Sequence, residues 1–125
     1  MKLSNFLMLK AIISLAFGIG FVVIPAVVWS IYGLTLEPAE IMMTRFFGAC
    51  LSGIGLICWI TRKADFNTLK GIILSLCIAD TVGFIIALAA QVSDIVNTLG
   101  WINVAIWLFL ALGLGYFRFL KPGTS

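Results

Sequence analysis

The sequence has no histidine and few cysteines, which limits the chemistry it can support. Histidine is the commonest metal ligand and the commonest general base, and the chain has none. Its three cysteines, Cys50, Cys58 and Cys77, form no Cys-x-x-Cys pair, and the first two lie about 12 Å apart along one predicted helix, too far for a disulfide. A phosphate-binding glycine loop and carboxylates at catalytic spacing are also missing. We therefore expect a protein that is not an enzyme, with no catalytic site, no cofactor and no metal ion.

Charged side chains are scarce as well, because only 10% of the residues are charged while 62% are hydrophobic. A soluble domain needs a larger polar share to cover its surface. A membrane span needs about 20 mostly apolar residues, and four such runs occur, at residues 5–29, 41–60, 68–90 and 101–120. The sequence predicts an all-α polytopic membrane protein: a single membrane domain of residues 1–125, built as a four-transmembrane-helix bundle in a lipid bilayer.

The first run contains a proline and begins like a signal peptide. Lys2 and Lys10 precede apolar residues, but the run is long for a signal peptide and has no A-x-A cleavage site, so we expect a retained helix. Pro25 has no amide hydrogen and so frees the carbonyl of Phe21. This predicts either a kink within the span, which a neighbouring helix can accommodate, or the end of a helix.

The distribution of charge predicts the orientation in the membrane. Basic residues that would share the cytoplasmic side are Lys2, Lys10, Arg62, Lys63, Lys70, Arg118 and Lys121. Acidic Glu37, Glu40 and Asp94 fall in or near the two opposite connections. We expect both termini in the cytoplasm and residues 30–40 and 91–100 outside. The net charge of +3 then sets orientation, and no nucleic-acid partner is expected.

Small residues predict where helices pack against each other, because association in lipid depends on close backbone approach. In the third span they recur every four positions, at Gly71, Ser75, Ala79, Gly83 and Ala87. In the second span they follow Arg45 on one helix face, at Gly48, Ser52 and Gly55. We expect both faces to contact other helices.

Two ionisable residues, Arg45 and Asp80, lie inside predicted spans. A charge at the bilayer centre costs about 2.5 to 3.5 kcal/mol on insertion scales, so such residues usually find partners or line a wet cavity. Arg45 is about 6 Å below the outer end of its predicted helix and Asp80 about 15 Å below its own. Two interpretations stay open for Arg45: a buried pair with Asp80, or a side chain that reaches outward to lipid phosphates.

Asp80 has a side chain too short to reach either membrane surface. Desolvation favours its neutral form, which can donate one hydrogen bond across a helix crossing. Asp80 is thus either a structural hydrogen-bonding group between helices or a proton-coupled or ligand-binding site.

A stretch from Ala16 to Arg62 carries several marks of one family. They are Pro25, Gly33, the segment LEPAE, the Arg-x-x-Gly-Ala pattern of Arg45, Gly48 and Ala49 in RFFGA, then Gly53, Gly55 and a closing WITR. In these marks the chain resembles a family of small uncharacterised four-helix bacterial integral membrane proteins, and the resemblance extends more loosely to Asp80. It implies a multi-pass protein of the bacterial inner membrane and draws attention to Arg45, but it implies no activity.

Two functions follow as alternatives. The first is a non-enzymatic integral membrane protein, acting as a homo-oligomer or as an accessory subunit of a larger membrane complex. The second is a minimal proton-coupled transporter or channel for an ion or a small amphipathic substrate, in which Asp80 titrates and Arg45 lies at the outer mouth.

Overall fold

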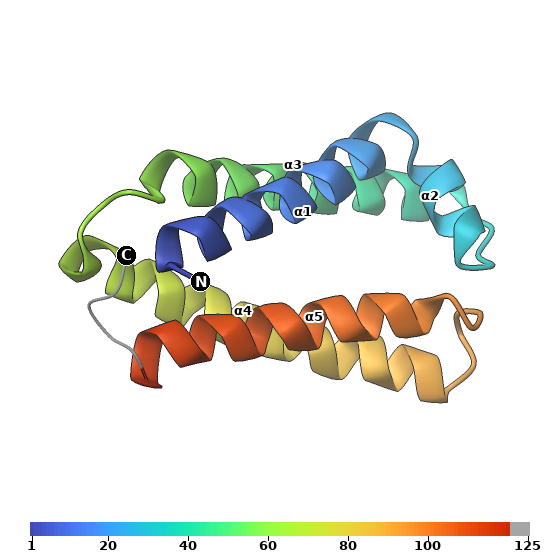
Figure 1. The fold of residues 1–125 in the computed structure, drawn as a ribbon. Coiled ribbons are helices and arrows are strands. Elements are labelled where there is room, and N and C mark those ends of the chain that lie inside the picture. The colour runs from blue at the N-terminus through green and yellow to red at the C-terminus, as the bar shows by residue number, and fades with distance from the viewer. Residues whose placement is uncertain (121–125) are drawn as a thin grey trace. The chain divides into compact units, whose positions relative to one another are not determined.

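The computed structural model describes residues 1–120, which form helices joined by short connections (Figure 1). The elements are α1 (Leu3–Val23), α2 (Pro25–Ile31), α3 (Pro38–Thr61), α4 (Phe66–Val92), α5 (Gly100–Gly115) and a π-helical turn, η1 (Tyr116–Leu120). Four helical segments are long and apolar enough to cross a membrane: Leu3–Val23, Pro38–Thr61, Phe66–Val92 and Gly100–Leu120. The predicted all-α class with four apolar spans is confirmed. Lys121 of the predicted basic set lies outside the described residues.

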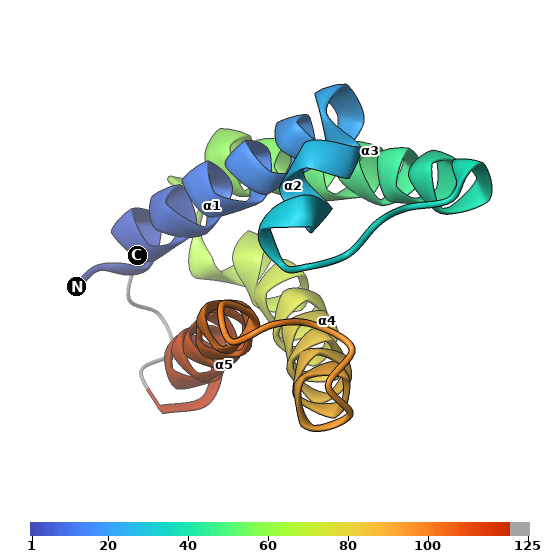
Figure 2. The same ribbon diagram turned by 90° about the vertical axis from the view of Figure 1, so that its right-hand side faces the viewer.

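The chain divides into two compact units, each of which contains a helical hairpin. One unit is residues 7–62, and the other combines residues 1–6 with the chain from Lys63 onward. In the first unit α1 and α3 lie side by side, and in the second α4 and α5 do (Figures 1 and 2). Each hairpin joins two segments long enough to span a bilayer, so each unit can cross the membrane twice.

The first predicted span is interrupted at Ile24, where α1 ends and α2 begins. Ile24 has φ −133° and ψ 56°, outside the helical region, and Pro25 is the first residue of α2. Proline fits this first position because its missing amide would have no intrahelical partner there. Ile24 still donates to the Gly20 carbonyl at 2.8 Å and accepts from the Val28 amide at 3.1 Å. Pro25 therefore marks a break between two helices rather than a kink within one.

Acidic side chains begin the two long central helices. At α3 a reciprocal capping box joins Glu37 and Glu40, in which the Glu37 amide donates to the Glu40 carboxylate at 2.9 Å, and Pro38 follows the cap. At α4 the Asp65 carboxylate accepts from the Thr68 amide at 3.3 Å. Hydrogen bonds from Thr68 lower the pKa of Asp65, because they favour its charged form. These caps satisfy amides that would otherwise have no acceptor.

The two connections predicted to lie on the outer side of the membrane both start with a Schellman motif. After α2, Leu34 donates to Trp29 and Gly33 to Ser30, each at 3.0 Å, and Gly33 has φ 84°. After α4, the corresponding donors are Ile95 and Asp94, and Asp94 has φ 58°. This motif places one residue in the left-handed region, where glycine has no steric penalty. The first motif therefore has the preferred residue, and the second holds an aspartate under strain.

Replacing Asp94 by glycine is expected to raise the free energy of unfolding by about 0.5 to 1 kcal/mol, because an L-residue in the left-handed conformation costs roughly 1–2 kcal/mol. Gly33→Ala is the matched opposite change and should lower it by about 1 kcal/mol. Thermal unfolding of both variants in mild detergent measures the two shifts. A loss of stability in Asp94→Gly would show that the aspartate side chain has a favourable role of its own.

In the unit that contains α4 and α5, the two helices approach each other at small residues. A Cβ on Gly83 would collide with the Trp107 ring, so the indole lies directly against the glycine. One and a half turns earlier, the Cys77 thiol donates to the Ala111 carbonyl with a sulfur-to-oxygen distance of 3.5 Å. Close approach of this kind is how helices gain contact area in lipid.

The start of α1 belongs to this same unit and packs on the end of α5. The Phe6 ring lies 5.7 Å from the ring centre of Phe109 and 5.6 Å from that of Phe117, both in tilted contact. It also occupies the space in which a side chain at Gly113 would lie. Tilted aromatic pairs at this distance are favourable, so the cluster fixes residues 1–6 on the second hairpin.

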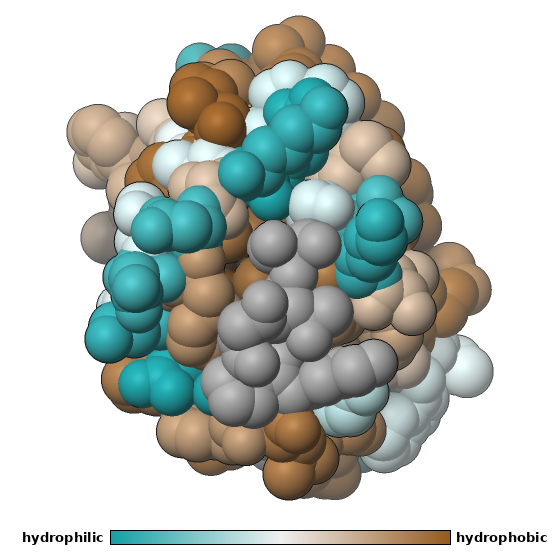
Figure 3. Space-filling model, turned by 60° about the vertical axis from the view of Figure 1, so that its left-hand side comes forward, coloured by the Kyte–Doolittle hydropathy of each residue, from teal (hydrophilic) through white to brown (hydrophobic). Residues whose placement is uncertain are grey.

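Large apolar side chains are exposed on all four spans. Ile12, Phe46, Ile85 and Phe109 are each at least half exposed. In the space-filling view, hydrophobic side chains share the visible face with hydrophilic ones (Figure 3). Such exposure is unfavourable in water and ordinary in contact with lipid tails, which fits the composition of a membrane protein.

Candidate functional site

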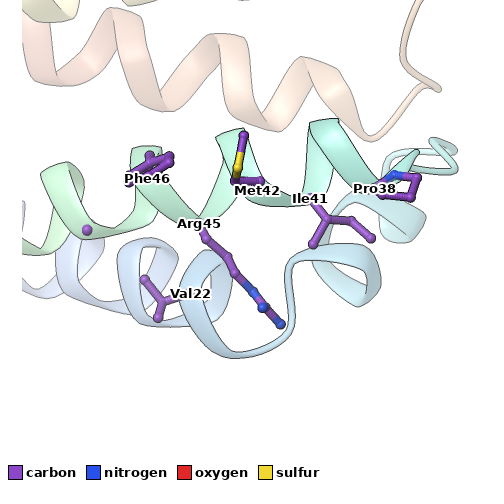
Figure 4. A pocket seen from close by; sticks show the side chains of 7 residues that line it. Val22, Pro38, Ile41, Met42, Arg45 and Phe46 are labelled. Carbon is purple, nitrogen blue, oxygen red and sulfur yellow. The ribbon is translucent and has the colours of Figure 1, made fainter.

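Arg45 lies on α3 in the unit of residues 7–62 and beside an open hollow. The hollow has a volume of about 450 Å³ and is lined by Val22, Pro38, Ile41, Met42, Arg45, Phe46 and Ala49. Figure 4 shows the Arg45 side chain extending from α3 toward the break between α1 and α2. Arg45 is the one charged residue among those that line the hollow. The arrangement combines a single guanidinium with apolar surface from two helices.

The Arg45 guanidinium has no counter-charge in its own unit. Arg45 is exposed and makes no hydrogen bond or ion pair within residues 7–62 of the described structure. The only acidic residues of that segment are Glu37 and Glu40, and both are engaged in the capping box at the start of α3. The guanidinium is therefore available to an anion from outside this hairpin.

The small residues that follow Arg45 on α3 contact α1. A Cβ on Gly48 would lie 2.7 Å from the Gly18 carbonyl oxygen, and one on Gly55 would lie 2.7 Å from Cγ of Leu15. A Cβ on Gly18 would lie 2.7 Å from the Ser52 amide nitrogen. Gly48, Ser52 and Gly55 thus lie where the two helices come closest, and Arg45 is beside this contact.

Asp80 lies in the middle of α4, in the other unit. It is 14 residues after Phe66 and 12 before Val92, about 21 and 18 Å from the two ends of the helix. Its side chain is only 3% exposed and has an interaction partner. On the same helix side, Cys77 and Gly83 contact α5 one turn before and one turn after it. A buried carboxyl group thus lies near the middle of a helix that is long and apolar enough to span a membrane.

Arg45 and Asp80 belong to different units, so their predicted pairing stays a prediction. Within its own hairpin each residue has a distinct environment, an open apolar hollow for Arg45 and a buried helix face for Asp80.

The predicted small-residue face of α4 has two different environments. Gly83 packs on Trp107 and Ala87 is buried. Ser75 and Ala79 are exposed, and a Cβ on Gly71 would meet nothing within 4 Å. Only the later half of this face is used within the described hairpin, and a contact of the earlier half with another helix stays a prediction.

Lys10 is a buried residue that sequence reasoning treated only as an orientation signal. It lies seven residues into α1, about 10 Å along the helix, and its side chain is 2% exposed. Ser14, one turn later on the same side, is also buried. Lys10 has an interaction partner. The available signal was its position well inside the apolar run, because lysines that only mark orientation lie at helix ends.

Gln91 is a second buried polar residue that sequence reasoning missed. Its side-chain amide donates to the Asn97 carbonyl at 3.1 Å, and its oxygen is buried against Gly100 without a hydrogen-bond donor among the described residues. This contact ties the end of α4 to the start of α5. Gly100 allows it, because any Cβ there would overlap the Gln91 amide.

Neither a metal site nor a comparison with known proteins assigns a function to these residues. No group of three or more His, Cys, Asp or Glu side chains that could hold a metal occurs within residues 1–120. No family model, no curated protein and no solved structure matches this chain. The resemblance to small four-helix bacterial membrane proteins stays a prediction.

Proposed function

We propose that this membrane protein acts through helix packing, as a homo-oligomer or as an accessory subunit of a larger membrane complex, and catalyses no reaction. The observation that carries this proposal is the use of glycine at the closest helix contacts. Gly18 and Gly48 bring α1 and α3 together, and Gly83 admits Trp107 between α4 and α5. Glycines at these positions let helices pack tightly in lipid, which supports a protein whose role depends on helix association.

A further contact with another membrane helix is supported by the exposed half of the small-residue face on α4. Gly71, Ser75 and Ala79 are open in the described hairpin. Small exposed residues at four-residue spacing leave room for a second helix to approach closely. The partner is either a second copy of the chain or a different membrane subunit.

We place the protein in the bacterial inner membrane with both termini in the cytoplasm. The basic residues Arg62 and Lys63 in the central connection support this orientation, since short cytoplasmic loops retain lysine and arginine. The Schellman turns at Gly33 and Asp94 would then face outward. The resemblance over residues 16–62 supports the bacterial location.

Asp80 favours the alternative of a minimal proton-coupled transporter or channel. A carboxyl group that is 3% exposed near the middle of a membrane helix is a recurrent feature of proton pathways. Its burial between two contacts with α5 equally suits a structural hydrogen bond, so the two functions differ in whether protons or solutes cross the membrane.

Proton flux in proteoliposomes separates the two functions. Vesicles with the full chain and a pH gradient should leak protons at the rate of empty vesicles, and Asp80→Asn should not change that rate. Thr81→Val is the control, because Thr81 is exposed and its hydroxyl only bonds the Cys77 carbonyl of the same helix. Flux through the wild type that Asp80→Asn abolishes and Thr81→Val preserves would replace the scaffold proposal by the transporter.

A further inference from the structure

The hollow beside Arg45 combines one cationic side chain with apolar walls. Its volume of about 450 Å³ falls within the roughly 300 to 1,000 Å³ of typical small-molecule sites. Apart from Arg45, the residues that line it carry no charge. A guanidinium offers several N–H donors in a planar fork that matches a phosphate, and the apolar walls suit a hydrocarbon chain.

The depth of Arg45 places its charge within reach of the lipid headgroups. Helix α3 has 24 residues and is about 36 Å long, slightly more than the roughly 30 Å of hydrocarbon. Arg45 is seven residues after Pro38, about 10 Å from the start of this helix. A long basic side chain at that depth keeps its stem along apolar surface and its charged end near the headgroups.

We propose that this hollow binds a phospholipid, with the phosphate on the Arg45 guanidinium and an acyl chain along Val22, Ile41 and Phe46. The hairpin itself leaves the charge unneutralised, because Glu37 and Glu40 cap α3. An anion from the surrounding bilayer is the complementary group that is always present. The bound lipid would occupy the hollow itself, which lies next to the break between α1 and α2.

Two variants test the two halves of the site separately. Arg45→Gln removes the charge and keeps the walls. Ala49→Phe keeps the charge and fills the hollow, since Ala49 is an exposed lining residue. Each has a control in the same unit. Arg62→Gln removes a guanidinium just after α3 that already donates to the Trp59 carbonyl and lies over the Trp59 ring. Cys50→Phe adds the same ring at an exposed neighbouring position on α3.

Native mass spectrometry of the full chain in mild detergent measures binding of phosphatidylglycerol, of diacylglycerol with the same acyl chains, and of inorganic phosphate. We expect one phosphatidylglycerol to bind in preference to the others. Arg45→Gln should weaken it about tenfold or more, the scale of a charge-assisted hydrogen bond. Ala49→Phe should weaken it as well, because the added ring occupies the space of the acyl chain. Arg62→Gln and Cys50→Phe should change it less than about twofold.

Three outcomes would overturn the proposal. Equal losses in Arg45→Gln and Arg62→Gln would indicate a general attraction between basic residues and lipid. Inorganic phosphate binding as tightly as the lipid would assign the hollow to a soluble anion. Unchanged lipid binding in both Arg45→Gln and Ala49→Phe, with circular dichroism showing intact helices, would mean that Arg45 interacts with another group of the protein.

Discussion

Gly48→Val is expected to lower the free energy of unfolding by about 3 kcal/mol, at the upper end of the usual cost of overpacking. The added Cβ would lie 2.7 Å from the Gly18 carbonyl oxygen and 2.8 Å from Cβ of Phe21. Both are parts of the α1 backbone or bonded directly to it, so α1 as a whole would have to move away from α3. Unfolding by heat or by a denaturing detergent, followed by helical circular dichroism, measures the loss.

Gly53, on the same helix, is the matched control. A Cβ there would meet nothing within 4 Å, so Gly53→Val, the same substitution, should change the free energy of unfolding by less than about 0.5 kcal/mol, because valine and glycine differ little in helix propensity. Gly18→Ala should behave like the Gly48 variant, because the contact is reciprocal. Similar results at Gly48 and Gly53 would contradict a close contact between α1 and α3.

The four spans could be predicted from the sequence because crossing a bilayer is a one-dimensional requirement. A run of about 20 apolar residues is long enough to cross the hydrocarbon core of the bilayer, and this does not depend on which helices pack against it. The division of the first run at Ile24 was harder to predict. Pro25 suits both a kink and the first residue of a helix, and only the backbone angles of Ile24 distinguish the two.

Which residues meet could not be predicted from spacing alone. Gly48 and Gly71 both belong to predicted small-residue faces. A Cβ on Gly48 would collide with α1, whereas a Cβ on Gly71 would meet nothing within 4 Å. The spacing identifies a face that permits close approach, and the partner helix decides whether it is used. Burial of Lys10 could not be predicted for a related reason: its position in the sequence fits an orientation signal, whereas the face of the helix on which it lies decides its exposure.

Arg45 shows what part of a candidate site a sequence can reveal. Its charge within an apolar run was visible, and so were the small residues that follow it. The hollow was not, because its wall at Val22 comes from α1 and depends on how two helices distant in sequence pack. The involvement of Glu37 and Glu40 in a capping box, which removes the nearest acidic side chains as partners, also required the structure.

Asp80→Leu is expected to lower the free energy of unfolding by about 3 kcal/mol, because it leaves the polar partner of a buried group unsatisfied. Asp80 is 3% exposed and has such a partner. Asp80→Asn keeps the shape and one hydrogen-bonding oxygen, so its loss should be smaller, about 1 kcal/mol. Thr81→Val should stay within about 0.5 kcal/mol of the wild type, as exposed positions usually do. An Asp80→Leu variant as stable as the wild type would show that the carboxyl is kept for function and not for stability.

Double-mutant cycles test whether Asp80 interacts with either of two cations of the other unit, Arg45 or Lys10. If Arg45 binds a phospholipid, Arg45→Gln and Asp80→Asn should add to within about 0.5 kcal/mol, because independent sites do not interact. An interaction term of about 0.5 to 3 kcal/mol would instead establish the Arg45 pair and remove the phospholipid site. Lys10→Gln belongs in the same cycle, because Lys10 has a cationic side chain that is only 2% exposed. Coupling of Asp80 to Lys10 but not to Arg45 would give the two residues different roles. Asp80 would then pair with Lys10 inside the protein, and Arg45 would bind lipid.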